Sequence, residues 1–257
     1  MYRYYKDLPE KELPDTLAEM EPLFAAVAHG CRAGLHHEAE IEVYRKRILR
    51  GKEQYINHKL GAFGSDLAVL SHFFEKPWAQ PASGLPEHEK AVVLSWAAFG
   101  LRSQGRLHEA IQPMKACLEM GIKQENWEGA AARANNLSEL MLTLGNVAEA
   151  VTYVRESVTH ADRSGDGFLK LYNRTTLADA LHQAGNLNEA EQWFREAEDM
   201  QKKRQPQYAF LYSLGGYLYC DLLLGQGTYN DVMERAEFAI EISKRNRWLL
   251  AIALDTL

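Results

Sequence analysis

Three carboxylates hold the same position in three successive stretches of the chain. Glu139, Asp179 and Asp221 each lie six residues before a glycine, and Phe99 holds the equivalent position in the preceding stretch. Like charges placed near one another repel, and a cationic group lying between them relieves that repulsion. We therefore expect an acidic, aromatic-flanked groove that binds a protein or peptide through a basic segment.

Polar and aromatic side chains accompany the carboxylates at neighbouring positions of the predicted helices. They are Arg102, Asn135, Tyr172, Thr175, His182 and Tyr217. A structural alternative stays open, because stacked helices often carry networks of ion pairs. In that case Arg102, Arg133 and Arg174 would pair with the carboxylates and tie adjacent helices together.

The other residues capable of chemistry form no complete catalytic or metal-binding set. His182 follows Asp179 by three residues, but no nucleophile or oxyanion donor accompanies the pair, which we interpret as a surface hydrogen bond. His29, Cys31, His36 and His37 cluster in the sequence, but His36 and His37 would project about 100° apart on a helix, which does not suit a shared metal ion. No Gly-x-x-x-x-Gly-Lys-Ser/Thr phosphate loop is present in the sequence. We expect no catalytic residue, no cofactor and no metal, and a helical enzyme is the alternative of another class.

Composition and charge disfavour nucleic acid and membrane as partners. The net charge is −6, whereas a nucleic-acid-binding protein normally carries a basic surplus. The densest basic run, residues 45–52, is interpreted as a solvated or interface helix. No stretch approaches the ~18–20 apolar residues of a membrane span. Cys31, Cys117 and Cys220 lie far apart, which favours reduced thiols and a cytoplasmic location.

The elements that must position these residues form an internal repeat. Glycines recur at 105, 145, 185 and 227, with spacings of 40, 40 and 42 residues, and an earlier copy turns at Gly34. Each glycine separates two amphipathic runs, because glycine readily adopts the left-handed conformation that ends a helix. An alanine follows five residues later at positions 39, 110, 150 and 190, and it allows the two helices to approach closely. Such hairpins bury their apolar faces only by stacking on one another.

This pattern resembles the tetratricopeptide repeat family. The resemblance rests on Gly-x-Leu/Val-x-Glu-Ala at 105–110, 145–150 and 185–190, and on Ala178, Phe194 and Ala197 in the third copy. It implies an all-α, right-handed α-solenoid of stacked antiparallel helix hairpins, with about five to six repeats of roughly 40 residues. It also implies a non-catalytic scaffold that binds proteins or peptides. The lysine and asparagine pattern of the family's chaperone-binding clamps is missing from the groove positions, so capture of an acidic C-terminus is not expected there.

We expect a single array over residues 1–257. Residues 1–76 would form irregular hairpins, one of them turning near Gly64, residues 77–86 a proline-rich connection, and residues 87–257 the regular repeats. The last repeat is truncated after a helix that leaves Trp248, Leu249, Ile252 and Leu257 exposed, whereas a solenoid normally ends in a polar cap. We therefore expect a fragment of a longer protein, whose exposed ends could pair two copies.

A second resemblance covers most of the chain. The stretches KELPDTLAEMEPLFAAVAHGCRAGLHHEAEIEVYRKRI, NLSELMLTLG and NRTTLADALHQAG resemble helical-repeat regions of large bacterial signalling proteins. In that family the repeats commonly follow a nucleotide-binding module of the STAND class and sense a ligand or partner. The resemblance implies the sensor or interaction region of a larger cytosolic signalling protein. A stand-alone adaptor or chaperone is the alternative.

Overall fold

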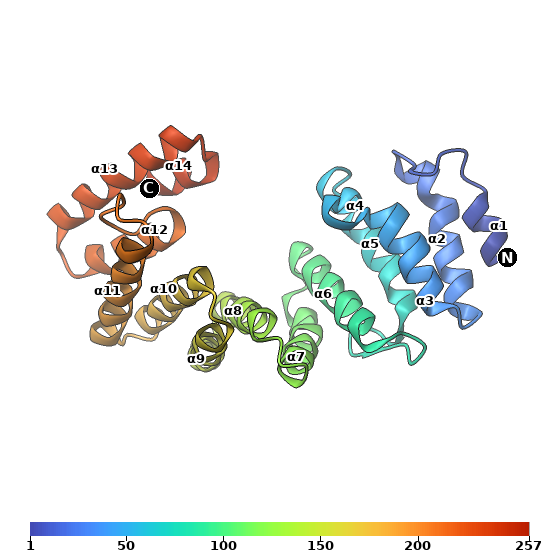
Figure 1. Cartoon of the computed structure of the whole chain (residues 1–257), viewed down its shortest axis with the longest axis horizontal. Helices are drawn as coiled ribbons and strands as arrows, with labels where there is room; N and C mark the ends of the chain where they lie inside the picture. Colours follow the sequence, from blue (N-terminus) through green and yellow to red (C-terminus); the bar gives the residue numbers. More distant parts are fainter. Residues whose placement is uncertain (257) are drawn as a thin grey trace. The chain divides into compact units, whose positions relative to one another are not determined.

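The computed structural model describes residues 1–256, apart from the side chains at positions 250, 254 and 255. The chain divides into two compact units, Met1–Met120 (unit 1) and Gly121–Leu257 (unit 2). Helices make up most of the regular structure of both units (Figure 1). Within the described residues, no helix combines the length and the apolarity of a membrane span.

Unit 1 is built from helices of very different lengths and one small strand pair. Its elements in chain order are α1 (Tyr2–Asp7), α2 (Leu17–Arg32), α3 (His36–Glu38), the π-helix η1 (Ala39–Leu49), η2 (Gly51–Glu53), α4 (Tyr55–His58), α5 (Phe63–Leu70), η3 (Ser71–Phe73), β1 (Phe74–Lys76), β2 (Gln80–Pro81) and α6 (Glu87–Ser103). The next helix, α7 (Leu107–Lys123), begins in unit 1 and ends in unit 2.

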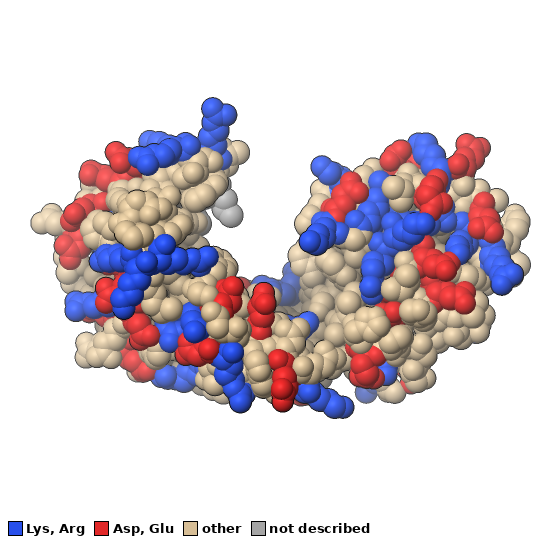
Figure 2. All heavy atoms as spheres, viewed as in Figure 1, with Lys and Arg blue, Asp and Glu red and all other residues tan. Residues whose placement is uncertain are grey.

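Unit 2 consists of consecutive helix hairpins. Its elements are α8 (Trp127–Thr143), α9 (Val147–Ser164), α10 (Gly167–Gln183), α11 (Leu187–Arg204), α12 (Ser213–Gly225), α13 (Tyr229–Asn246) and α14 (Leu249–Asp255). Helix α10 packs against α8 on one side and α12 on the other, so the first helices of successive hairpins are neighbours. Acidic and basic side chains are interspersed on the face of each unit that Figure 2 shows.

The glycines identified from the repeat do end helices as expected. Their φ angles lie between 73° and 79°, in the left-handed region that non-glycine residues adopt only with strain. They are Gly34, Gly105, Gly145, Gly185 and Gly227. The repeat alanines Ala39, Ala110, Ala150 and Ala190 are completely buried. Both features of the predicted hairpin are therefore confirmed.

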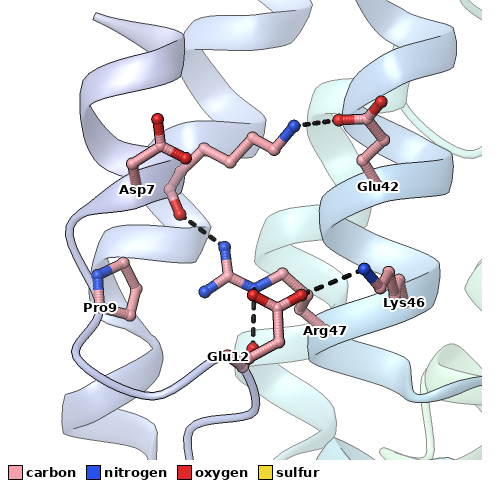
Figure 3. Close-up of a pocket in the computed structure, with 7 residues that line it drawn as sticks. Asp7, Pro9, Glu12, Glu42, Lys46 and Arg47 are labelled. Carbon is pink, nitrogen blue, oxygen red and sulfur yellow. Dashed lines mark hydrogen bonds and ion pairs between the residues drawn. The ribbon is translucent and has the colours of Figure 1, made fainter.

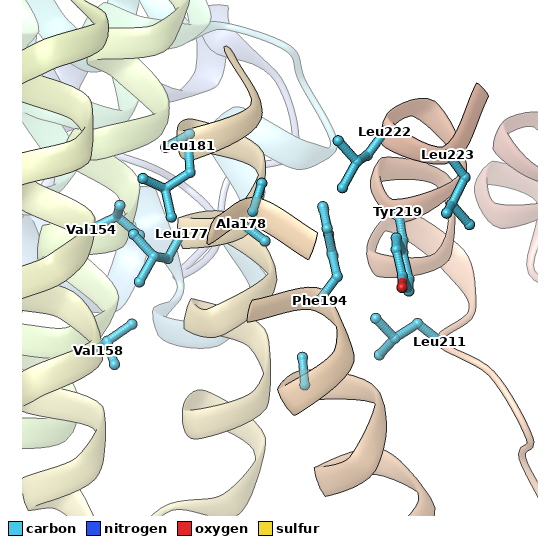
Figure 4. Close-up of a cluster of buried hydrophobic side chains, with 13 residues drawn as sticks. Val154, Val158, Leu177, Ala178, Leu181, Phe194, Leu211, Tyr219, Leu222 and Leu223 are labelled. Carbon is cyan, nitrogen blue, oxygen red and sulfur yellow. The ribbon is translucent and has the colours of Figure 1, made fainter. Parts of the chain in front are cut away.

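The core of unit 2 continues from one hairpin into the next. Phe194 of α11 stacks flat on Tyr219 of α12, with ring centroids 4.8 Å apart and an interplanar angle of 7°. On its other side the core reaches Leu177 of α10 and Val154 of α9, both almost completely buried (Figure 4). Each such contact removes apolar surface that a single hairpin would leave in water, at about 25 cal/mol per Å².

The structure adds detail to two expected features and corrects a third. Gly64 lies inside α5, and the turn before that helix is at Gly61, whose φ is 62°. The proline-rich connection contains order, because β1 and β2 pair antiparallel with Phe74 opposite Pro81. Proline is tolerated at a strand edge, where its missing N–H is not needed. At the other end of the chain, Ile252 is half-buried rather than exposed.

The remaining residues expected to be exposed at the C-terminal end are only partly described. Leu249 is 81% exposed and Trp248 42% exposed, in agreement with the expectation. Leu257 lies outside the described residues. Trp248, just before α14, and Leu249, its first residue, therefore form an exposed apolar surface.

The basic run at 45–52, interpreted as a solvated or interface helix, is solvated only in part. Arg47 on η1 is only 5% exposed, and its guanidinium donates hydrogen bonds to the main-chain oxygens of Lys6 and, at 2.8 Å, Glu12 (Figure 3). These residues line a surface pocket, around which Lys6 pairs with Glu42 and Lys46 pairs with Glu12. The run therefore holds the N-terminal segment against η1.

A buried carboxyl lies at the centre of unit 1. Asp66 on α5 is completely buried and accepts hydrogen bonds from the Tyr44 hydroxyl at 3.0 Å and the Asn57 amide at 2.8 Å. Burial raises the pKa of Asp66 to about 6, although both hydrogen bonds oppose the rise. The carboxyl therefore stays protonated in the folded chain over a pH range in which the unfolded chain ionises.

The replacement Asp66→Asn should change how stability depends on pH. Between pH 4 and pH 6 the folded chain holds more protons than the unfolded chain, so the contribution of Asp66 to the free energy of unfolding falls as pH rises. The variant has no such loss. Its free energy of unfolding should therefore rise by about 3 kcal/mol relative to that of the wild type over this range, from 1.36 kcal/mol per pKa unit. Urea unfolding from pH 4 to pH 7 measures the gain. The exposed control Glu21→Gln should show none, and equal pH profiles for all three proteins would contradict the prediction.

The turn at Gly185 offers a test of the repeat itself. A Cβ at Gly185 would meet no atom within 4 Å. The only cost of Gly185→Ala is therefore the backbone strain of an alanine at a φ of 78°. We expect a loss of about 1 kcal/mol in the free energy of unfolding. Gly225→Ala is the matched control, since its Cβ is also unobstructed and its backbone is helical. Gly225→Ala should be neutral or should stabilise the fold by about 0.5–1 kcal/mol. A larger loss of stability at Gly225 than at Gly185 would refute the role of Gly185 as the residue that ends the helix.

Candidate functional site

The carboxylates predicted from the repeat lie on three neighbouring helices of unit 2. Glu139 is on α8, Asp179 on α10 and Asp221 on α12, and α10 packs against both of the other helices. Glu139 and Asp179 are half-buried, whereas Asp221 is exposed. These three residues are called the acidic row below. Phe99 and Arg102 are on α6, which belongs to unit 1.

Glu139 is held by hydrogen bonds within its helix and across to the next repeat. Its Oε1 accepts from the Asn135 amide at 3.0 Å and from the Tyr172 hydroxyl of α10 at 3.1 Å. Asn135 is almost completely buried, so this contact fixes one carboxylate oxygen against the helix surface. Tyr172 therefore both flanks the acidic row and joins two repeats.

Asp179 is the central member of the row, and its pKa is raised. Burial is the first cause, and the negative charges of Asp221 and Glu139 add to it. The Gln183 amide, which donates to Asp179 at 3.4 Å, and His182 oppose the rise. Asp221 and Glu139 are thus close enough for their charges to act on Asp179.

His182 contacts a different carboxylate from the one expected. Its Nδ1 lies 3.6 Å from the Asp221 carboxylate of α12, and its hydrogen bond to Asp179 is not observed among the described residues. The pairing of His182 with Asp179 as a surface hydrogen bond is therefore wrong. The reason is that α12 packs beside α10 and brings Asp221 to the imidazole.

The alternative prediction, that arginines pair with the acidic row, is wrong for Arg174. This residue is 9% exposed, and its guanidinium binds Asp162 at 2.9 Å and Glu196 at 2.7 Å. Those carboxylates belong to α9 and α11, so Arg174 ties second helices to α10 and does not neutralise the acidic row. The Tyr172 hydroxyl joins the row across repeats instead, and the His182 imidazole lies beside Asp221.

The remaining predicted residues differ in how accessible they are. Thr175 is 2% exposed, and its hydroxyl donates to the main-chain oxygen of Tyr172 at 2.7 Å. Tyr217 on α12 is half-buried. In unit 1, Phe99 is 37% exposed and packs edge-on against Phe63 and Trp96, with ring centroids 5.9 and 6.0 Å apart.

A cavity of about 350 Å³ lies in unit 2 near the N-terminal end of α10. It is lined by residues of α10, α11, the connection 205–212 and the start of α12, together with Trp248. Tyr172 and Thr175 belong to it, but its other residues were not predicted. The one signal in the sequence is the spacing of 42 rather than 40 between the last two turn glycines, which accompanies the longer connection.

The histidines and cysteine considered for metal binding lie in separate environments. His37 pairs with the buried Glu89 at 2.7 Å, and His29 stacks on Tyr5. Burial raises the pKa of the Cys31 thiol to about 12. Among the described residues, no group of three His, Cys, Asp or Glu side chains is arranged to hold a metal ion.

Part of the chain matches a known repeat family. Residues 131–203, which cover most of α8 and the hairpins up to α11, match the tetratricopeptide repeat family. A solved structure of a Podosopora anserina kinesin light chain-like protein with nearly identical TPR-like repeats is 14% identical, with 91% of this chain and 99% of that chain covered and a TM-score of 0.51. A structure of a single-residue variant of the same protein is 13% identical, with 90% of this chain and 97% of that chain covered and a TM-score of 0.53. A comparison with curated proteins finds no match.

The fold and the comparisons together define an all-α repeat protein of stacked helix hairpins. The resemblance stated from the sequence is confirmed: residues 131–203 are tetratricopeptide repeats.

The electrostatic coupling within the acidic row can be measured directly. Asp221→Asn removes one of the negative charges that raise the pKa of Asp179, so that pKa should fall. It should stay above the ordinary range of an aspartate, because burial is the larger cause. Carboxyl-detected NMR titration reports the change. Glu241→Gln on α13 is the charge-matched control, and an Asp179 pKa that is the same in both variants would show that the row is not coupled.

Proposed function

We propose that this chain is a non-catalytic scaffold that binds a basic protein or peptide segment along the acidic row of unit 2. The observation that carries the proposal is the placement of Glu139, Asp179 and Asp221 on the neighbouring helices α8, α10 and α12, where the charges of Glu139 and Asp221 add to the burial that raises the pKa of Asp179. Arg174, one of the arginines expected to pair with them, is engaged by Asp162 and Glu196 instead. A cationic partner would stabilise negative charge on the row.

The residues that flank the acidic row add aromatic surface and hydrogen-bond donors. Tyr172 and Tyr217 supply aromatic surface on which arginine or lysine side chains can pack, since cations are attracted to aromatic faces. Asn135 and Tyr172 orient Glu139, because both donate hydrogen bonds to its carboxylate. This carboxylate is therefore held before a ligand arrives, which lowers the entropy lost on binding.

Tetratricopeptide repeats generally act as protein-interaction scaffolds, which supports the class of function. Within the proposal, the chain serves as the sensor or interaction region of a larger bacterial signalling protein in the cytoplasm. That part is supported by the second resemblance of the sequence. Pairing of two copies through the apolar surface at Trp248 and Leu249 is included in the proposal.

The test replaces two row carboxylates without changing their shape. Asp179→Asn with Asp221→Asn should weaken binding of a synthetic peptide of alternating arginine and leucine by about tenfold or more, because charge-assisted contacts are lost. Isothermal titration calorimetry measures the dissociation constant. The wild type should also bind the peptide more weakly as salt is added.

Two comparisons make this test decisive. The control pair Glu234→Gln with Glu241→Gln removes the same charge from exposed positions of α13 and should leave binding unchanged. A peptide with glutamate in place of arginine should not bind the wild type. Equal weakening in the two double variants, or no binding of the basic peptide to the wild type, would refute the proposal.

A further inference from the structure

The cavity beside α10 arises from an unusual connection between repeats. Residues 205–212 join α11 to α12, whereas residues 124–126 and 165–166 suffice for the two preceding connections. The longer connection enters α12 through Ser213, whose φ of 54° is in the left-handed region. Gly216 follows, and a Cβ there would lie 2.6 Å from the Leu211 carbonyl oxygen. The connection is thus tightly folded over the end of α12, and a hollow of about 350 Å³ is left beneath it.

Two stacked pairs of aromatic rings line this cavity. Phe168 and Tyr172 of α10 are nearly parallel, with ring centroids 5.8 Å apart. Tyr212 and Trp248 stack with centroids 5.9 Å apart. Phe168 is 54% exposed and Trp248 42% exposed, so large apolar surfaces stand open to solvent where these rings meet the cavity. Exposed aromatic surface of this kind marks binding sites more often than ordinary protein surface.

Two polar groups of the cavity can donate hydrogen bonds to a ligand. Gln201 is 5% exposed, and its amide nitrogen has no hydrogen-bond partner among the described residues. A buried donor left unpaired costs roughly 1–3 kcal/mol. The Arg204 guanidinium lies over the Phe168 ring at 5.8 Å, and no described carboxylate pairs with it.

Two acceptors beside the cavity already have donors. The Gln205 side-chain oxygen accepts from the Tyr212 hydroxyl at 3.2 Å, and the Tyr172 main-chain oxygen accepts from Thr175. The cavity therefore offers an apolar body, one buried amide donor and one positive charge. Its polarity is opposite to that of the acidic row, which lies further along α10.

We propose that this cavity binds a carboxylate carried on an aromatic or branched apolar group. The apolar group lies against the rings of Phe168, Tyr172 and Tyr212, and the carboxylate accepts hydrogen bonds from Arg204 and Gln201. Arginine suits this role because its planar guanidinium matches a carboxylate. Such a group occurs in a free organic acid and in the C-terminal residue of a peptide. The site goes beyond the proposed function, because it depends on different charged residues.

The experiment compares two acids with their uncharged amides. Isothermal titration calorimetry is carried out on the full chain with 3-phenylpropionate and 3-phenylpropionamide, and with acetyl-Gly-Gly-Phe as its free acid and its C-terminal amide. An acid that binds at least about tenfold more tightly than its amide supports the site. Binding of the small acid alone identifies a free acid as the ligand, and binding of the peptide acid identifies a peptide C-terminus. If neither acid binds, the proposal is wrong.

Matched variants locate the binding. Arg204→Gln should weaken binding of the acid about tenfold and leave binding of the amide unchanged, whereas Lys203→Gln, one residue away and outside the cavity lining, should have no effect. Gly215→Leu places a side chain into the cavity and should abolish binding of both, with circular dichroism confirming the fold. Equal weakening in the Arg204 and Lys203 variants would overturn the proposal. Asp179→Asn with Asp221→Asn should not affect this site, which separates it from the acidic row.

Discussion

The stacking of one hairpin's apolar face on the next is the interaction on which the rest of unit 2 depends. Phe194 lies flat on Tyr219, and the same core reaches Leu177 and Val154. Because each hairpin buries its apolar face only against its neighbours, α8, α10 and α12 are brought side by side. The alignment of three carboxylates follows from that packing, and so does the hollow where the connection 205–212 replaces a shorter turn.

Features that depend on local chemistry could be predicted from the sequence. Gly185 ends a helix because of its own backbone freedom, and Ala190 is buried because only a small side chain fits where two helices touch. The register of the acidic row follows from counting residues back from such glycines. The partners of Arg174 and His182 could not be found this way, because several carboxylates lie within reach and packing chooses among them.

Desolvation acts on two aspartates with different consequences. Asp66 is enclosed completely, and Tyr44 and Asn57 donate to it, so its interactions are complete within the fold. Asp179 is half-buried beside two other carboxylates and receives one long hydrogen bond from Gln183. Burial raises the pKa of both carboxyls, but at Asp179 a group from outside could still supply the missing stabilisation. The surroundings of each carboxyl, rather than the size of its pKa change, separate a structural role from a binding role.

The N-terminal segment is attached in a way that constrains its length more than its composition. Arg47 donates to the main-chain oxygens of Lys6 and Glu12, and Arg50 donates to that of Pro14. Every residue type carries such an oxygen, so substitutions in this segment preserve the acceptors. Inserting or deleting one residue would instead move the carbonyls out of register with two largely buried guanidinium groups. Evolution of this segment should therefore tolerate point substitutions and reject changes of length.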